Sequence, residues 1–127
     1  MVYAVAAELM ASSRIEGLLA AAGCPVTLLE PESAALGPLG ARRAVIILDL
    51  AVPPEVRAAV FAAAAGAGSA VIAVGPHLEA EALRQARRDG ASEVLTRGGL
   101  ATGLVPLVAK HLARLAPGEG IPGPPPA

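Results

Sequence analysis

The segment AVIILDLAVPPEV, residues 44–56, contains a strand, an acidic residue and the start of a helix. Four consecutive aliphatic residues, 45–48, lead directly into Asp49, and prolines stand at positions 53 and 54. An aliphatic run without polar alternation is typical of a strand buried on both faces, and proline is favoured in the first turn of a helix. The segment therefore predicts one β–α unit, with a carboxylate placed where a buried strand ends.

The same strand-and-helix pattern recurs along the chain. The five apolar runs are residues 2–6, 26–29, 45–48, 71–74 and 93–95. Runs of this kind, separated by helical segments, favour a parallel sheet with helices on both faces and right-handed crossovers. We therefore predict an α/β fold of five strands and five helices that is complete by Pro117.

The helices differ in how clearly they are signalled. Ser12 or Ser13 can cap a first helix that ends at Gly23. Residues 32–41 contain glycines and a proline, so we expect a short or irregular second helix there. A third helix is predicted from the prolines to about residue 65, and a fourth over 79–88. In the last helix, apolar residues and His111 trace one packed face from 104 to 115.

The composition limits the domain organisation and the classes of function that this chain can have. The 127 residues fit one domain, predicted over 1–116, and the Pro/Gly-rich segment 117–127 is predicted to be disordered. A net charge of −1 and 2% aromatic residues argue against nucleic-acid binding. The uncharged stretch 58–76 reads as helix, turn and strand rather than a membrane span. With one cysteine and no signal-peptide pattern, we expect a cytoplasmic protein without a membrane partner.

Candidate functional residues are those at the carboxyl ends of the predicted strands, where parallel α/β sheets collect ligands and catalytic groups. These positions hold Ala6, Ala7 and Glu8, then Asp49, Gly75 with His77 in the loop beyond it, and Thr96 with Arg97. Asp49 alone has the character of a nucleophile or a magnesium ligand. A purely structural role is the alternative, in which Asp49 caps the following helix or pairs with Arg97.

Two segments resemble bacterial two-component receiver domains. VIILDLAVP, residues 45–53, is similar to the receiver segment that carries the phosphoacceptor aspartate, with Asp49 at that place. EALRQARRDGASEVLTRGG, residues 81–99, is similar to the receiver's fourth helix, turn and fifth strand. The resemblance covers residues 1 to about 115. It implies a flavodoxin-like, doubly wound five-stranded sheet with strand order 2-1-3-4-5.

The same resemblance shows what this sequence lacks. Where receivers carry a pair of acids after the first strand, this chain has Ala6 and Ala7, and only Glu8 can offer a carboxylate. The usual hydroxyl after the fourth strand is replaced by Gly75, the lysine after the fifth by Arg97, and the switch aromatic by Val94. Phosphoryl transfer to aspartate needs a magnesium ion to offset charge. The resemblance therefore implies a degenerate receiver, or pseudo-receiver.

We expect a stand-alone, non-enzymatic response-regulator module that binds a protein partner, or itself, without phosphorylation and without a cofactor. The expected partner face combines the fourth helix, carrying Arg84, Arg87 and Arg88, with the fifth strand and fifth helix. One alternative is a working phosphoacceptor, in which Glu8 and Asp49 bind magnesium and Arg97 balances the phosphoryl charge. Another is a small-ligand or nucleotide site in the strand-end crevice. The crevice residues are Ala6, Ala7, Gly75, His77 and Thr96.

Overall fold

The computed structural model describes residues 1–115, which form a five-stranded parallel sheet. The strands are β1 (Val2–Val5), β2 (Thr27–Leu29), β3 (Val45–Asp49), β4 (Ala70–Gly75) and β5 (Glu93–Thr96). They lie in the order β2-β1-β3-β4-β5, so the predicted fold class and strand order are confirmed. The predicted tail, 117–127, lies outside the described residues.

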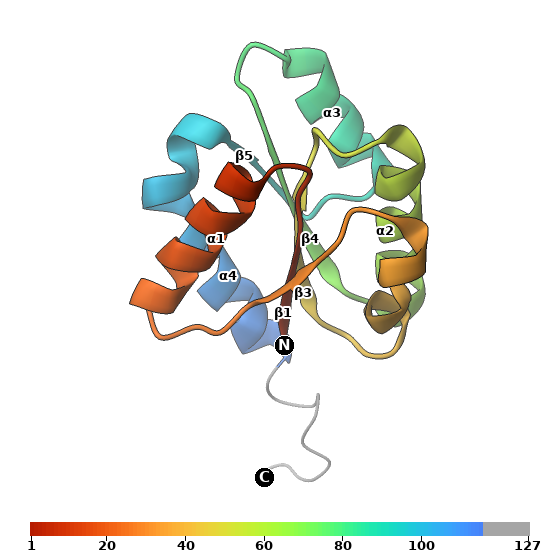
Figure 1. The fold of residues 1–127 in the computed structure, drawn as a ribbon, viewed down its shortest axis with the longest axis horizontal. Coiled ribbons are helices and arrows are strands. Elements are labelled where there is room, and N and C mark those ends of the chain that lie inside the picture. Colours follow the sequence, from red (N-terminus) through yellow and green to blue (C-terminus); the bar gives the residue numbers. More distant parts are fainter. Residues whose placement is uncertain (116–127) are drawn as a thin grey trace, which may run out of the picture.

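Four α-helices cover the sheet on both faces (Figure 1). They are α1 (Leu9–Ala21), α2 (Pro54–Ala67), α3 (Ala80–Asp89) and α4 (Leu100–Leu115). In Figure 1 the sheet is seen nearly edge-on, with α1 and α4 on one side and α2 and α3 on the other. No helix within residues 1–115 is long and apolar enough to cross a bilayer.

The core is divided into two aliphatic layers by the sheet. On β3, Ile46 and Leu48 point into the layer under α2 and α3, whereas Val45 and Ile47 point into the layer under α1 and α4. β1 and β3 are buried along their whole length, while the edge strands β2 and β5 are partly exposed. This burial explains why the central strands read as unbroken aliphatic runs.

The helical structure between β2 and β3 is short and irregular, as expected. Two 3₁₀ helices, η1 (Ser33–Ala35) and η2 (Gly37–Gly40), take the place of a second α-helix. Gly37, Pro38 and Gly40 disfavour a continuous helix. Leu39 is fully buried in the α2 layer, so this segment still closes the core.

The start of α1 corrects the predicted serine cap. The helix begins at Leu9 and its N-cap is Glu8, which has extended backbone and makes no side-chain cap. Ser12 lies inside the helix, where its hydroxyl donates to the Glu8 carbonyl over 3.1 Å. Because the connection from β1 to α1 is only residues 6–8, Ser12 and Ser13 both lie inside the helix and cannot cap it. The helix end at Gly23, by contrast, is close to the observed end at Ala21.

Candidate functional site

Asp49 is the last residue of the central strand β3, at the carboxyl edge of the sheet. It is 1% exposed. Its Oδ1 accepts a hydrogen bond from the backbone N–H of Ala51 over 3.0 Å, and the next residue, Leu50, is tied to β4 through the Val74 carbonyl at 2.9 Å. The carboxylate is therefore held rigidly in its own turn. It does not cap α2, whose N-cap is Pro53.

Arg97 brings together the two acidic candidates. It follows β5 in the short 3₁₀ helix η3 (Arg97–Gly99). Its Nη2 donates to Asp49 Oδ1 over 3.1 Å, and its Nη1 lies 3.9 Å from Glu8 Oε1. The Asp49 contact is the stronger of the two, because Asp49 is buried whereas Glu8 is 63% exposed. One guanidinium thus bridges the predicted phosphoacceptor and the predicted metal ligand.

The second oxygen of Asp49 is left without a partner. Asp49 Oδ2 is buried and accepts no hydrogen bond from any residue in the described range. A buried acceptor without a partner is costly and calls for an explanation. Residues 1–115 therefore satisfy only part of the hydrogen-bonding capacity of the Asp49 carboxylate.

Within residues 1–115, the other crevice candidates make no polar side-chain contact with Asp49. Ala6 is buried and Ala7 exposed, and neither carries a polar side chain. Thr96 Oγ1 accepts from the Gly99 N–H over 3.1 Å, so it caps η3. His77 is exposed in the loop after β4 and has no hydrogen bond to residues 1–115. Of the predicted site residues, only Glu8, Asp49 and Arg97 come together.

Gly75, at the end of β4, is closely packed although it has no side chain. A Cβ at this position would lie 3.2 Å from Leu50 Cδ1 and 3.2 Å from Leu83 Cδ2. Leu50 follows Asp49 and Leu83 belongs to α3, so two leucines already fill the space beside the end of β4. A hydroxyl-bearing side chain could enter only if these leucines moved.

The oxygen donors at this edge do not fit a magnesium ion. Magnesium prefers about six oxygen ligands in octahedral geometry. Here Ala6 and Ala7 supply no side-chain oxygen, and the guanidinium of Arg97 already contacts both Asp49 and Glu8. Within residues 1–115, no group of three or more metal-binding side chains is placed to hold a metal ion.

A pocket of about 290 Å³ opens beside Asp49, and we call it the Asp49 pocket. Its lining combines four charged and five apolar residues: Glu8, Met10, Ala11, Arg14, Ile15, Asp49, Val74, Arg97 and Leu100. Arg14 was missed by the sequence reasoning. Its position on α1, in the turns that directly follow β1, is the signal that could have placed it near the carboxyl edge.

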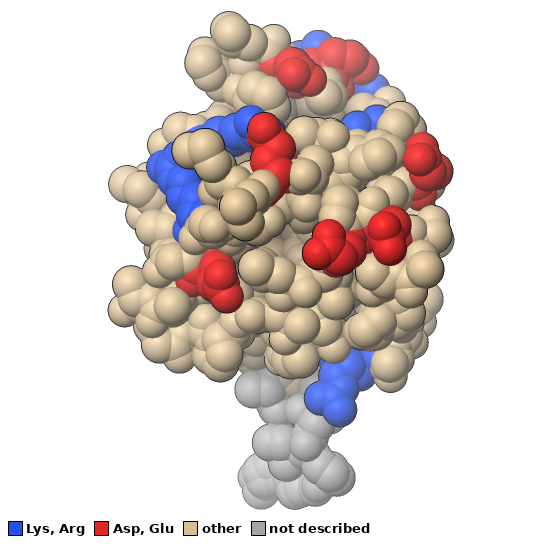
Figure 2. All heavy atoms as spheres, in the orientation of Figure 1, with Lys and Arg blue, Asp and Glu red and all other residues tan. Residues whose placement is uncertain are grey.

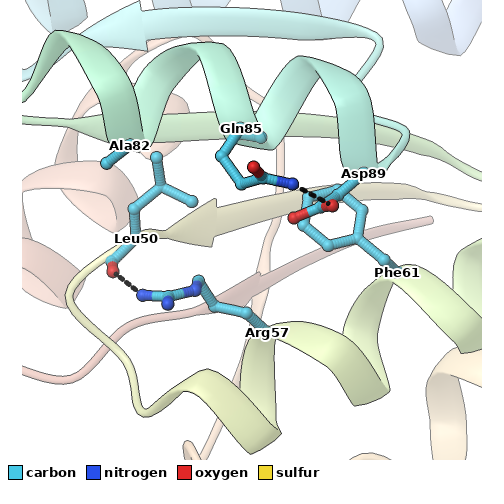
Figure 3. A pocket seen from close by; sticks show the side chains of 7 residues that line it. Leu50, Arg57, Phe61, Ala82, Gln85 and Asp89 are labelled. Carbon is cyan, nitrogen blue, oxygen red and sulfur yellow. Dashed lines mark hydrogen bonds between the residues drawn. The ribbon is translucent and has the colours of Figure 1, made fainter.

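A second, smaller pocket lies between α2 and α3 (Figure 3). There Arg57 reaches back from α2 and donates to the Leu50 carbonyl over 2.8 Å. Across the pocket, Gln85 donates to Asp89 over 2.8 Å. Arg57 was also missed by the sequence reasoning, and its contact fixes the loop that directly follows Asp49.

The arginines predicted for a partner face are all exposed on α3, as expected. Arg84 and Arg88 both pair with Glu81, at 2.9 and 2.7 Å. These contacts, that of Arg88 first, lower the pKa of Glu81 below its ordinary value. Arg87 makes no ion pair with residues 1–115. At the top of Figure 2, where Figure 1 places α3, acidic and basic side chains lie next to one another.

His111 is buried on α4 and belongs to a polar cluster with β5. Its Nε2 lies 2.9 Å from Glu93 Oε2, and Lys110 Nζ lies 2.7 Å from the same oxygen. The hydrogen bond from Lys110, followed by that from His111, holds the pKa of Glu93 below its ordinary value. This cluster lies at the start of β5, whereas Arg97 follows the end of that strand, so it is separate from Asp49.

No protein-family model and no curated protein matches the sequence. Among solved structures, full-length FixJ from B. japonicum superposes with a TM-score of 0.77 and 18% identity, covering 91% of this chain and 59% of that one. NtrX from Brucella abortus in complex with ATP gives 0.75 and 18%, covering 89% and 27%. The beryllofluoride-activated NtrC4 receiver domain dimer gives 0.69 and 18%, covering 89% and 96%.

These likenesses show the fold. The chain has the fold of response-regulator receiver domains, and it corresponds to nearly the whole of the isolated NtrC4 receiver domain. It spans only 59% of the length of FixJ and 27% of that of NtrX.

Proposed function

We propose that this chain is a non-enzymatic, receiver-like signalling module that works without phosphorylation of Asp49. The observation that supports the proposal best is the contact between Arg97 and Asp49 Oδ1. A guanidinium at this place already neutralises the carboxylate that would have to attack a phosphoryl group. Phosphoryl transfer depends on metal ions to offset charge, and the neighbouring side chains do not provide a set of oxygen ligands for one.

Incubation with acetyl phosphate and magnesium, followed by intact-mass spectrometry, tests the proposal. We expect no phosphate adduct, and no change in the NMR spectrum on addition of beryllofluoride, which would detect a site whose adduct hydrolyses quickly. The matched control is Asp49→Asn. An adduct or beryllofluoride response that disappears in Asp49→Asn would establish the phosphoacceptor alternative instead.

A triple variant tests the physical reason. Ala6→Asp, Ala7→Asp and Arg97→Lys together add two carboxylates and replace the bridging guanidinium with an ammonium. If missing metal ligands and the Arg97 contact keep Asp49 unreactive, this variant should gain a beryllofluoride response that the natural chain lacks. A variant that folds, binds magnesium and still fails to respond would contradict that reason.

The module would act through the face formed by α3, β5 and α4, most directly with a second copy of the chain. β5 is an edge strand, paired on one side only, and Arg87 projects from α3 without an ion pair to residues 1–115. Leu78, 84% exposed, lies directly before α3 and adds apolar surface. NtrC4, which shares the fold, has a dimeric receiver domain.

Sedimentation analysis over a range of concentrations tests this face. We expect self-association that is weakened by Arg87→Glu. Arg42→Glu is the matched control, because Arg42 is also exposed but precedes β3 rather than lying on this face. Self-association unchanged in Arg87→Glu would exclude the face, and a monomer at every concentration would exclude the second copy as its partner.

A further inference from the structure

The Asp49 pocket is lined by two polar groups that have no partner within residues 1–115, together with apolar side chains. We propose that it binds a small zwitterion with an apolar side chain, of the chemical class of the aliphatic α-amino acids. This proposal goes beyond the module's protein contacts, because it assigns a ligand to the edge of the sheet where phosphorylation is not expected.

The first unmet group is the acceptor Asp49 Oδ2. Its neighbour Oδ1 is already shared by Ala51 N–H and Arg97, whereas Oδ2 has no partner in the described part of the chain. Asp49 lines the pocket, and a small rotation of its buried carboxylate would let a donor placed there supply the missing hydrogen bond. A protonated amine is the strongest such donor, because its hydrogen bond to a carboxylate is charge-assisted.

The second polar group is the guanidinium of Arg14, whose side chain is exposed to solvent. It lines the same pocket from α1 and makes no ion pair or hydrogen bond with residues 1–115. A guanidinium matches the two oxygens of a carboxylate. The pocket's charges also balance, since Glu8 and Asp49 offset Arg14 and Arg97. A ligand of zero net charge that carries both signs therefore complements the pocket better than a cation or an anion alone.

The rest of the lining is apolar. Ile15, Val74 and Leu100 are buried and form the floor. Met10 is 85% exposed, and its flexible thioether side chain can adapt to a ligand of irregular shape. The volume of about 290 Å³ lies just below the usual range for ligand pockets. The ligand must therefore be small, which disfavours a nucleotide.

Isothermal titration calorimetry of the full chain with L-leucine tests the proposal. Two probes each remove one charged group: 4-methylpentanoate lacks the amine, and 3-methylbutylamine lacks the carboxylate. We expect leucine to bind, with each truncated probe weaker by about tenfold, the effect of one charge-assisted hydrogen bond. No heat from leucine at about 10 mM, or a truncated probe that binds as tightly as leucine, would overturn the proposal.

Two exposed arginines provide the matched variants. Arg14→Ala should weaken the affinity for leucine by about tenfold, and Arg42→Ala should leave that affinity unchanged. In NMR, the methyl groups of Ile15, Val74 and Leu100 should shift on titration. Unchanged affinity in Arg14→Ala, or shifts confined to residues outside the pocket, would also overturn the proposal. These readouts are independent of acetyl phosphate and of self-association, so the ligand can fail while the proposed module stands, and the reverse.

Discussion

Asp49 occupies a place that is unfavourable for an unpaired carboxylate, because it is 1% exposed at the end of a strand buried on both faces. Arg97 and the Ala51 N–H both contact Oδ1. The Arg97–Asp49 pair is therefore a structural contact. It also explains why the chain can keep an aspartate at this position without the surrounding acids of a phosphorylation site.

Removal of Arg97 should destabilise the fold. Arg97→Ala leaves the buried Asp49 carboxylate without its cation, and we expect a loss of about 1–3 kcal/mol in the free energy of unfolding. Urea denaturation measures it. Arg87→Ala removes an exposed arginine that makes no ion pair with residues 1–115, and it should change stability by less than about 0.5 kcal/mol.

A double-mutant cycle separates the pair from other effects of the substitution. If the Asp49 contact causes the loss, Arg97→Ala should cost less in an Asp49→Ala background than in the natural chain. Equal costs in both backgrounds would show that Arg97 stabilises the fold by another route.

Glu93 makes stability depend on pH. Lys110 and His111 hold its pKa below the ordinary value in the folded state. A group with a lowered folded pKa contributes stability above its unfolded pKa, about 4.3 for glutamate, and loses that contribution as the pH falls through the folded pKa. The difference in melting temperature between the natural chain and Glu93→Gln should therefore shrink on acidification below about pH 4.3.

Thermal unfolding followed by circular dichroism between about pH 6 and about pH 3 measures this difference. Glu16→Gln serves as the control, since Glu16 is exposed on α1 and has no hydrogen bond within residues 1–115. A constant gap between the natural chain and Glu93→Gln over the whole range would contradict the role of Glu93.

Gly75 and Gly66 differ in how closely other side chains pack around them. Gly75 ends β4 at a point where Leu50, from the β3–α2 loop, and Leu83, from α3, leave no room for a side chain. Gly66 is different, because a Cβ there would meet nothing within 4 Å. Close packing thus favours glycine at position 75, whereas at position 66 the surroundings leave space for a larger side chain.

Substitution at these glycines should shift stability in opposite directions. Gly75→Thr should cost about 1–3 kcal/mol by overpacking against Leu50 and Leu83. Gly66→Ala, within α2, should gain about 0.5–1 kcal/mol, because alanine loses less backbone entropy in a helix. Chemical denaturation checks both. Two variants of equal stability would show that α3 moves freely to accommodate a larger residue at position 75.

The two core layers share the same five strands, so we expect the described domain to unfold as one unit. Ile46 and Ile47 are adjacent and fully buried, yet they point into opposite layers. Their common strand, β3, pairs with both β1 and β4. If one core layer unfolded alone, one face of β3 would lose its packing and become exposed to solvent.

Ile46→Ala and Ile47→Ala should therefore each cost about 2–5 kcal/mol and lower a single transition. Far-UV circular dichroism and the signal of Tyr3, which lies in the α2–α3 layer, should report the same midpoint in both variants. Leu78→Ala, at an 84% exposed position, should change stability by less than about 0.5 kcal/mol. Different midpoints from the two probes in Ile47→Ala would show that the layers unfold separately.

The strands, most of the helices and the edge at which Asp49, Gly75 and Arg97 lie were all predictable from local patterns. Burial on both faces produces unbroken aliphatic runs, and helical packing repeats every three to four residues, so these signals depend on near neighbours alone. The irregular second connection was predictable for the same reason, since Gly37, Pro38 and Gly40 disfavour a helix wherever they occur.

The pairing of side chains could be decided only by tertiary structure. Arg97 reaches Asp49 across 48 positions of sequence, Leu50 and Leu83 close the space at Gly75, and Arg14 joins the pocket from α1. Such contacts depend on strand order, on register and on where a helix begins, and α1 begins at Leu9 rather than after a serine cap. Local periodicity indicates which edge a residue occupies, but a hydrogen bond also requires a distance and a direction, and these are set by the packed chain as a whole.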